Sequence, residues 1–244
     1  MTTAQGRPDP YNPLDDENLA RNVADALEAE PVHPFPPAPA RWTHNPIPST
    51  AGLYALYYVG SAEPYESLGD LTRRDTDADD AGVGPHAIPI YVGRALATAT
   101  RQGQASNKGP KGLRLRLGEH RGSIKQASAT LDLDDFRFRY LIVKDIWVPL
   151  GEYGLLRRYT PLWNNVLDGF GIHGPGGGRG EQARSLWDTL HPGRSFAASL
   201  PDNNLSIGRI KVLVRQALDA MVHDQPVPSE LLIAEPPEEP ELTE

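Results

Sequence analysis

Two short apolar runs, each ending in glycine, constrain the fold of this chain most strongly. They cover residues 52–60 (GLYALYYVG) and 88–93 (IPIYVG). Aromatic and branched residues between turn-forming glycines are typical of buried strands. A third run at residues 135–143 (DFRFRYLIV) begins with polar and apolar residues in alternation and ends apolar, which predicts a central strand. Together the three runs predict a small sheet in the middle of the chain.

Segments with helical periodicity flank these runs. Apolar residues recur at helical spacing within residues 15–30, 113–124 and 207–221, and residues 152–159 predict a short helix before a proline. Residues 31–48 are rich in proline and should be extended. Residues 61–87 are polar and charged, which predicts a long loop with a disordered tip. Residues 146–150 are expected to be extended.

One domain with two appendages is the simplest division of the chain. Residues 1–48 form an N-terminal helix with a proline-rich strap, and residues 49–225 form one α/β domain. Residues 226–244 are an acidic, proline-rich tail that is expected to be mobile. No cysteine is present, which excludes disulfides and thiolate metal sites. No apolar run approaches the roughly 18 residues that span a bilayer, and no signal peptide opens the chain, so a cytoplasmic protein is expected.

The charge is unevenly distributed. The net charge of −8 argues against a nucleic-acid partner, but residues 90–215 contain 19 Lys and Arg against 10 Asp and Glu. The acidic residues therefore lie mostly in the N-terminal third and in the tail. A basic central segment favours a phosphate-binding surface. The alternative is that both regions are ordinary solvated faces.

Three charged or titratable residues in the central segment have the chemistry of phosphodiester hydrolysis. Glu152 offers a hard oxygen ligand for a single Mg²⁺, which usually keeps several waters. Arg116 is suited to clamp a phosphate oxygen, and His120, one helical turn later, is suited to accept a proton near neutral pH. Each also has a structural interpretation, as a surface glutamate, an exposed helix arginine or a core histidine.

Three further side chains complete the candidate set. The hydroxyls of Tyr54 and Tyr91 are placed to position water and phosphate, although both rings would also serve as core aromatics. Asn164 would hold Glu152 or a metal-bound water through its amide. Each of these residues is a weak indication by itself, and the assignment depends on the order and spacing of the whole set.

The order of these residues resembles the GIY-YIG nuclease superfamily. The two tripeptides of that family correspond to residues 52–54 (GLY) and 91–93 (YVG). The family's helical arginine corresponds best to Arg116, although Arg114 and Arg121 keep that assignment open. Its metal-binding glutamate and late asparagine correspond to Glu152 and Asn164.

The flanking segments resemble one branch, the type II restriction endonucleases that cut CCGCGG. That branch similarly has a histidine four residues after the arginine, here His120. It also shares short segments that read here as residues 12–14 (NPL), 163–164 (WN), 168–173 (DGFGIH), 185–188 (SLWD) and 191–194 (HPGR). The charged insertion at residues 61–87 departs from this pattern.

The resemblance implies an α/β sandwich with a three-stranded antiparallel sheet flanked by helices, with an N-terminal helical arm and a C-terminal extension. It implies a Mg²⁺-dependent homodimer that cuts both strands of a palindromic DNA site. Candidate DNA-reading residues are His173, Arg179, Arg184 and Arg194, because arginine to guanine is the commonest specific contact. The alternatives are a GIY-YIG repair or mobile-element nuclease and a catalytically silent DNA-binding protein.

Overall fold

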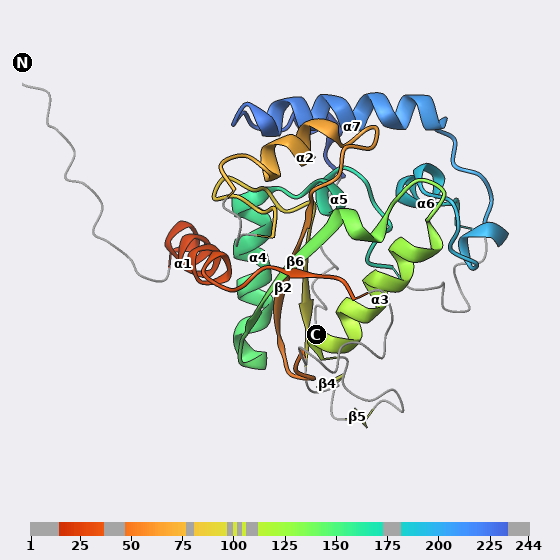
Figure 1. Cartoon of the computed structure of the whole chain (residues 1–244). Helices are drawn as coiled ribbons and strands as arrows, with labels where there is room; N and C mark the ends of the chain where they lie inside the picture. The colour runs from red at the N-terminus through yellow and green to blue at the C-terminus, as the bar shows by residue number, and fades with distance from the viewer. Residues whose placement is uncertain are drawn as a thin grey trace, which may run out of the picture.

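The computed structural model confirms a mixed α/β fold built on one antiparallel sheet (Figure 1). It describes residues 15–36, 47–76, 81–96, 100–101, 104–105, 112–172 and 182–233. The main sheet has the order β1-β6-β2-β3, from β1 (His33–Pro34), β6 (Phe136–Ile142), β2 (Gly52–Tyr58) and β3 (Tyr91–Ala95). It has four strands and not the expected three, because part of the proline-rich segment pairs with β6. Proline lacks an N–H donor and is tolerated on such an edge strand.

The central strand β2 separates two apolar cores. All seven of its residues are buried, and successive side chains point to opposite faces of the sheet. Tyr54 and Leu56 belong to one core, whereas Leu53 and Ala55 belong to the other. Because neither face of β2 is open to water, helices must cover the sheet on both sides.

Helices accordingly form a layer on each face. One layer contains α1 (Asp16–Glu28) and α4 (Val148–Tyr159), and the other contains α3 (Leu113–Gln126) and α6 (Leu186–Leu190) (Figure 1). Helix α1 begins where the Asp15 side chain accepts a hydrogen bond from the Asn18 N–H at 2.8 Å. Helix α4 lies close to its neighbours at two glycines. A Cβ at Gly151 would lie 2.5 Å from Leu53, and one at Gly154 would lie 3.0 Å from Ala20.

The insertion at residues 61–87 is a packed element and not the expected loop. It contains α2 (Glu66–Thr72), which crosses one end of the sheet beside α7 (Ile207–Val222) (Figure 1). Tyr65, Leu68 and Leu71 are buried at helical spacing, a pattern that the surrounding charges obscure in the sequence. Residues 77–80, at the tip predicted to be disordered, lie outside the described residues.

Two other sequence-based expectations were wrong at the local level. Residues 146–150 are not extended: η3 (Asp145–Trp147) leads directly into α4, and Pro149 occupies the first helical turn, where its missing N–H costs nothing. The start of the segment expected to be a mobile tail also packs. It forms η5 (Ser229–Leu231), and Leu231 and Leu232 contact the core.

The remaining elements are short. They are α5 (Leu162–Asn165), the paired strands β4 (Thr100–Arg101) and β5 (Gln104–Ala105), and the 3₁₀ turns η2 (Leu133–Asp135) and η4 (Ala197–Ser199). Of these, α5 matters most for the site because it follows β3 along its outer side. Among the described residues, no helix is long and apolar enough to cross a membrane.

Candidate active site

The two tyrosines of the apolar runs meet on one face of the sheet. Tyr54 pairs with Gly93 across β2 and β3, and the rings of Tyr54 and Tyr91 have centroids 6.4 Å apart. A Cβ at position 93 would lie 2.4 Å from the Tyr54 hydroxyl oxygen. Glycine at this position therefore leaves the space into which the Tyr54 hydroxyl extends, toward the outer strand of the sheet.

Helix α3 brings a histidine and an arginine to these tyrosines. The Tyr54 hydroxyl and His120 Nε2 are 2.7 Å apart, and the His120 and Tyr91 ring centroids are 4.9 Å apart. His120 is completely buried. Arg116, one turn earlier on the same helix, interacts with both tyrosine hydroxyls. The helical spacing of four residues thus places both side chains at the same site.

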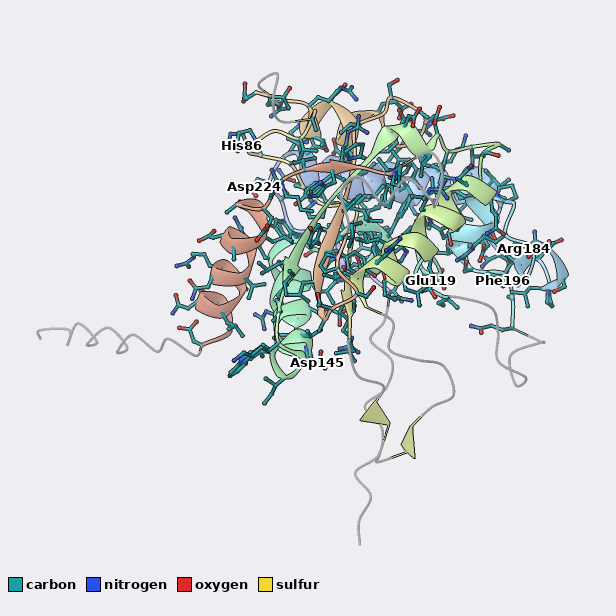
Figure 2. All side chains as sticks on the ribbon, turned by 60° about the horizontal axis from the view of Figure 1, so that its bottom comes forward. His86, Glu119, Asp145, Arg184, Phe196 and Asp224 are labelled. Carbon is teal, nitrogen blue, oxygen red and sulfur yellow. The ribbon has the colours of Figure 1, made fainter. Side chains whose placement is uncertain are left out.

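Arg116 has a carboxylate partner that sequence reasoning missed. Its Nη1 donates to Glu119 Oε2 at 2.7 Å, and both side chains are about one-fifth exposed (20% and 19%). Glu119 projects from α3 (Figure 2). An arginine held by one carboxylate at the surface keeps further donors for an incoming phosphate, since a guanidinium has five N–H groups. Glu119 therefore orients Arg116 at the rim of the site.

Glu152 reaches the site from the opposite helical layer. It lies on α4, and its Oε2 is 3.1 Å from Nη1 of Arg94 on β3. Burial raises the pKa of the Glu152 carboxyl, and the positive charges of Arg94 and Arg116 offset this effect in part. Sequence reasoning also missed Arg94, although strand alternation places it on the α4 side of β3. The site is therefore at the β3 edge, where the two layers meet.

Both tyrosines remain protonated at neutral pH. Burial raises the pKa of Tyr54 well above its ordinary value, and burial raises the pKa of Tyr91 to about 12. Burial alone would lower the pKa of Arg116, but the two hydroxyls and Glu119 raise it overall. The site therefore offers two neutral hydroxyls and one permanent cation around a histidine.

Asn164 has a different role from the predicted one. We expected its amide to hold Glu152 or a metal-bound water. Its Oδ1 accepts from the Val92 N–H at 2.8 Å and its Nδ2 donates to the Val92 carbonyl at 2.9 Å. Both amide atoms thus bind the backbone of β3, so Asn164 fixes the strand that carries Tyr91.

Arg194 was wrongly predicted to read DNA. Its side chain is 2% exposed and forms a buried ion pair with Asp188 at 2.6 Å. A guanidinium enclosed in this way cannot reach a base edge. The Arg184 guanidinium is also largely occupied by contacts within the protein, because it donates to the carbonyls of Ala197 and Leu200 and pairs with Asp202. His173 and Arg179 lie outside the described residues.

The donor set of the site fits Mg²⁺ better than a metal held by several protein ligands. Within the described ranges, no group of three or more histidine or acidic side chains could hold a metal ion. Mg²⁺ is commonly bound through one or two carboxylates and keeps several waters. Glu152 provides one such carboxylate, and its raised pKa marks a partly desolvated group that a nearby cation would stabilise.

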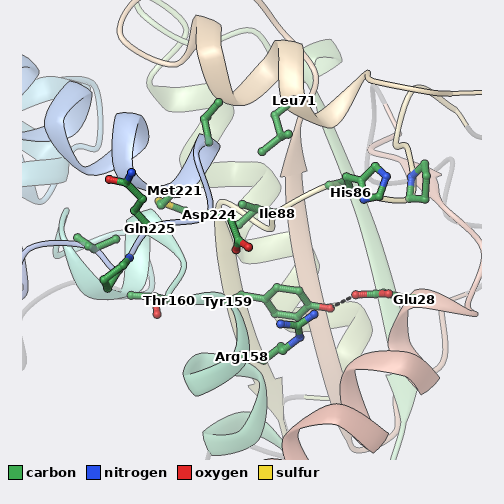
Figure 3. Close-up of a pocket in the computed structure, with 15 residues that line it drawn as sticks. Glu28, Leu71, His86, Ile88, Arg158, Tyr159, Thr160, Met221, Asp224 and Gln225 are labelled. Atoms are coloured by element: carbon green, nitrogen blue, oxygen red, sulfur yellow. Dashed lines mark hydrogen bonds between the residues drawn. The ribbon is translucent and has the colours of Figure 1, made fainter.

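A separate cavity of about 590 Å³ lies elsewhere, between the C-terminal ends of α4 and α7 (Figure 3). Its lining includes Tyr159, whose hydroxyl donates to Glu28, together with Met221 and Asp224. Among the residues described, the side chains of the candidate site do not line this cavity, namely Tyr54, Tyr91, Arg116, His120 and Glu152. The cavity is therefore not part of the candidate site.

The comparison with protein families agrees with this geometry. The model of the Eco29kI GIY-YIG domain matches residues 48–218, which is more than half of the chain. No curated protein sequence matches the chain. The matched segment includes every strand and helix that contributes a side chain to the site. The chain belongs to the Eco29kI GIY-YIG family, a family of restriction endonucleases.

Proposed function

We propose that this protein is a type II restriction endonuclease. It would hydrolyse phosphodiester bonds in both strands of a short, GC-rich palindrome resembling CCGCGG, with Mg²⁺ as cofactor. The observation that carries the proposal is the convergence of Tyr54, Tyr91, Arg116, His120 and Glu152 at one edge of the sheet. They come from four different elements and supply one group for each task of the reaction.

The Tyr54 and His120 pair provides the proton acceptor for the attacking water. Burial keeps Tyr54 protonated, so its hydroxyl would donate to His120 Nε2 when the imidazole carries its proton on Nδ1. A water held beside the hydroxyl would lose its proton toward this pair as it attacks phosphorus. The Tyr91 hydroxyl, on the neighbouring strand, donates to the water or to a phosphate oxygen.

Two charged groups act on the phosphate. Arg116 stabilises the negative charge that develops on the non-bridging oxygens, in a partly buried position that strengthens the interaction. Glu152 would hold Mg²⁺, which when bound supplies Lewis-acid stabilisation of the leaving oxygen. Arg94 lies against Glu152 and balances the charge of its carboxylate.

The basic central segment and the proposed symmetry concern the DNA. Residues 90–215, with 19 basic and 10 acidic residues, are suited to contact phosphates. We propose a twofold homodimer, because a palindrome presents the same half-site to each subunit and one active site then acts on each strand. Restriction of foreign DNA would take place in the cytoplasm.

Cleavage of unmethylated plasmid DNA by the purified full-length protein tests the proposal. We expect discrete fragments whose sequenced ends share one palindrome, with cleavage in Mg²⁺ and none in EDTA. Glu152→Ala should lower the rate about a thousandfold, since Lewis-acid stabilisation contributes several kcal/mol. Glu63→Ala is the matched control, because Glu63 pairs with Lys211 and Arg215 at a remote surface.

The outcomes separate the alternatives. Structure-dependent nicking without a shared end sequence would indicate a repair or mobile-element nuclease. Tight DNA binding without cleavage of any unmethylated substrate would reject the nuclease and indicate a silent DNA-binding protein.

A further inference from the structure

A turn at residues 168–172 forms one wall of the candidate site. Its central side chain, Phe170, is fully buried. The Phe170 ring stacks on His120 with centroids 4.7 Å apart and an interplanar angle of 18°, and it meets Tyr91 edge-on at 5.0 Å. One aromatic ring thus contacts both the proposed proton acceptor and one of the proposed hydroxyl donors.

This stack complements the hydrogen bond that His120 makes with Tyr54. The Tyr54 hydroxyl fixes the position of Nε2 but leaves the imidazole able to rotate about the hydrogen-bond direction. Phe170 covers one face of the His120 ring, and the Tyr91 ring lies against the same imidazole at an interplanar angle of 58°. Together these contacts define the plane of the imidazole.

The backbone of the same turn contacts Tyr91 directly. A Cβ at Gly171 would lie 2.5 Å from the Tyr91 hydroxyl oxygen, so only glycine allows this approach. Gly169 has φ +108°, a conformation that other residues rarely adopt, and a Cβ there would meet the Ser185 hydroxyl. The turn is therefore shaped to lie close to both Tyr91 and α6.

Arg194 fixes the turn through its whole guanidinium group. It donates to the carbonyl oxygens of Gly169, Phe170 and Ile172 at 2.8, 3.2 and 2.9 Å. Its two remaining N–H groups donate to the Asp188 carboxylate, each at 2.6 Å. All five donors of the fork are used, which makes this a well-satisfied buried ion pair.

We propose that Phe170 is a positioning residue for the nuclease, and that Arg194 positions Phe170. In this arrangement the arginine fixes the turn, the Phe170 ring fixes the plane of His120, and His120 keeps its hydrogen bond to Tyr54. The proposal deepens the proposed function and rests on it for its catalytic consequence. Its structural part, the orientation of His120, is independent of DNA cleavage.

Phe170→Leu in the full-length protein tests the proposal, because leucine keeps an apolar group and removes the stacked ring. Phe35→Leu is the matched control, since Phe35 is also buried and its ring packs on Phe138. We expect Phe170→Leu to lower kcat about tenfold to a hundredfold with KM within about twofold, the loss expected for a misplaced catalytic group. Phe35→Leu should leave kcat unchanged.

Nuclear magnetic resonance of histidine labelled with ¹⁵N provides a second measurement. Only Phe170→Leu should shift the ring-nitrogen signals of His120, assigned with His120→Gln. Unchanged His120 signals, or equal losses of kcat in the two leucine variants, would overturn the proposal. A shifted His120 signal in a protein that cleaves no DNA would support the positioning role and reject the nuclease instead.

Gly171→Ala gives an independent check of the backbone contact. Its Cβ would displace the Tyr91 hydroxyl, so we expect kcat to fall with little change in KM. Gly208→Ala, where a Cβ meets no atom within 4 Å, is the control. An unchanged kcat in Gly171→Ala would show that the turn does not position Tyr91.

Discussion

Two buried histidines in this protein make the same hydrogen bond in different surroundings. His120 Nε2 is 2.7 Å from the Tyr54 hydroxyl, and His191 Nε2 is 2.6 Å from the Tyr65 hydroxyl. Both imidazoles are at most 1% exposed. Both histidines contact aromatic rings, but the Tyr54 and His120 pair also lies beside Arg116 and Glu152, whereas His191 bonds Thr130 at 2.9 Å.

The difference shows that a tyrosine and a histidine in contact do not make a site by themselves. Burial lowers the pKa of His191 to about 3, with a smaller effect from Lys211, so it stays neutral and serves as a hydrogen-bonded core residue. The His120 pair has a cation and a carboxylate close to its hydroxyl. The neighbouring charges, and not the pair itself, indicate catalysis.

Removing the hydroxyl from each pair should give the largest contrast. Tyr54→Phe should lower kcat of DNA cleavage about a hundredfold or more, the usual range for acid–base groups. Tyr65→Phe should leave kcat within about twofold but lower the free energy of unfolding by about 1–3 kcal/mol. It leaves His191 Nε2 and the Trp163 indole N–H without their partner. Cleavage kinetics and urea unfolding measure both effects, and equal losses of kcat would contradict the comparison.

Acid should destabilise the protein through His191. The unfolded chain binds a proton on this histidine below about pH 6.5, but the folded chain does not until about pH 3. Stability therefore falls as pH decreases through that window, by about 2 kcal/mol between pH 6.5 and pH 5. His191→Gln removes this contribution, so its free energy of unfolding should fall less over the same range.

Urea unfolding at pH 7 and pH 5 measures this difference. His223→Gln, at the exposed end of α7, controls for the loss of a histidine. An identical pH dependence in wild type and His191→Gln would show that His191 is protonated while folded.

Replacing Glu152 should have the smallest effect on stability, and the pH dependence of this effect should be opposite to that of His191. Burial raises the pKa of its carboxyl, so the folded chain retains this proton to a higher pH than the unfolded chain does. Its contribution to stability is present below the ordinary pKa and is lost as pH rises. Glu152→Gln should therefore raise the melting temperature slightly at pH 8 without divalent ions, and the gain should shrink toward pH 4.5.

Thermal unfolding with and without Mg²⁺ tests this reasoning. Added Mg²⁺ should reduce the difference in melting temperature between Glu152→Gln and the wild type, because an ion bound at Glu152 stabilises only the wild type. A lower melting temperature of Glu152→Gln at pH 8 would mean that the Arg94 ion pair outweighs the burial cost.

The sequence predicted the parts of the site that depend on local geometry. A spacing of four places Arg116 beside His120, whereas Tyr54 and Tyr91 meet only because β2 and β3 pair in the register that sets Tyr54 opposite Gly93. The approach of Glu152 depends on how α4 packs over the sheet through Gly151 and Gly154, which no local pattern encodes.

Two of the wrong expectations, those for Arg194 and for residues 61–87, have one cause, the packing of polar residues. Arg194 was expected to read DNA, which requires an exposed side chain, but Asp188, six residues earlier, pairs with it in the interior. The charges of residues 61–87 similarly concealed the apolar spacing of α2. Residue type therefore predicts burial poorly in two situations. A charged side chain can be buried when an ion pair satisfies it, and a few buried apolar residues are hard to recognise within a long polar segment.

The amide of Asn164 has a consequence for aggregation. Strand β3 lies at the end of the main sheet, and unpaired backbone groups on such an edge invite pairing with another chain. The Asn164 side chain satisfies the outward N–H and C=O of Val92, and the Trp163 N–H donates to the Ile90 carbonyl at 2.9 Å. One carboxamide thus imitates the peptide group of a missing strand. An aspartate at this position would keep the acceptor and lose the donor, leaving the Val92 carbonyl open to a foreign strand.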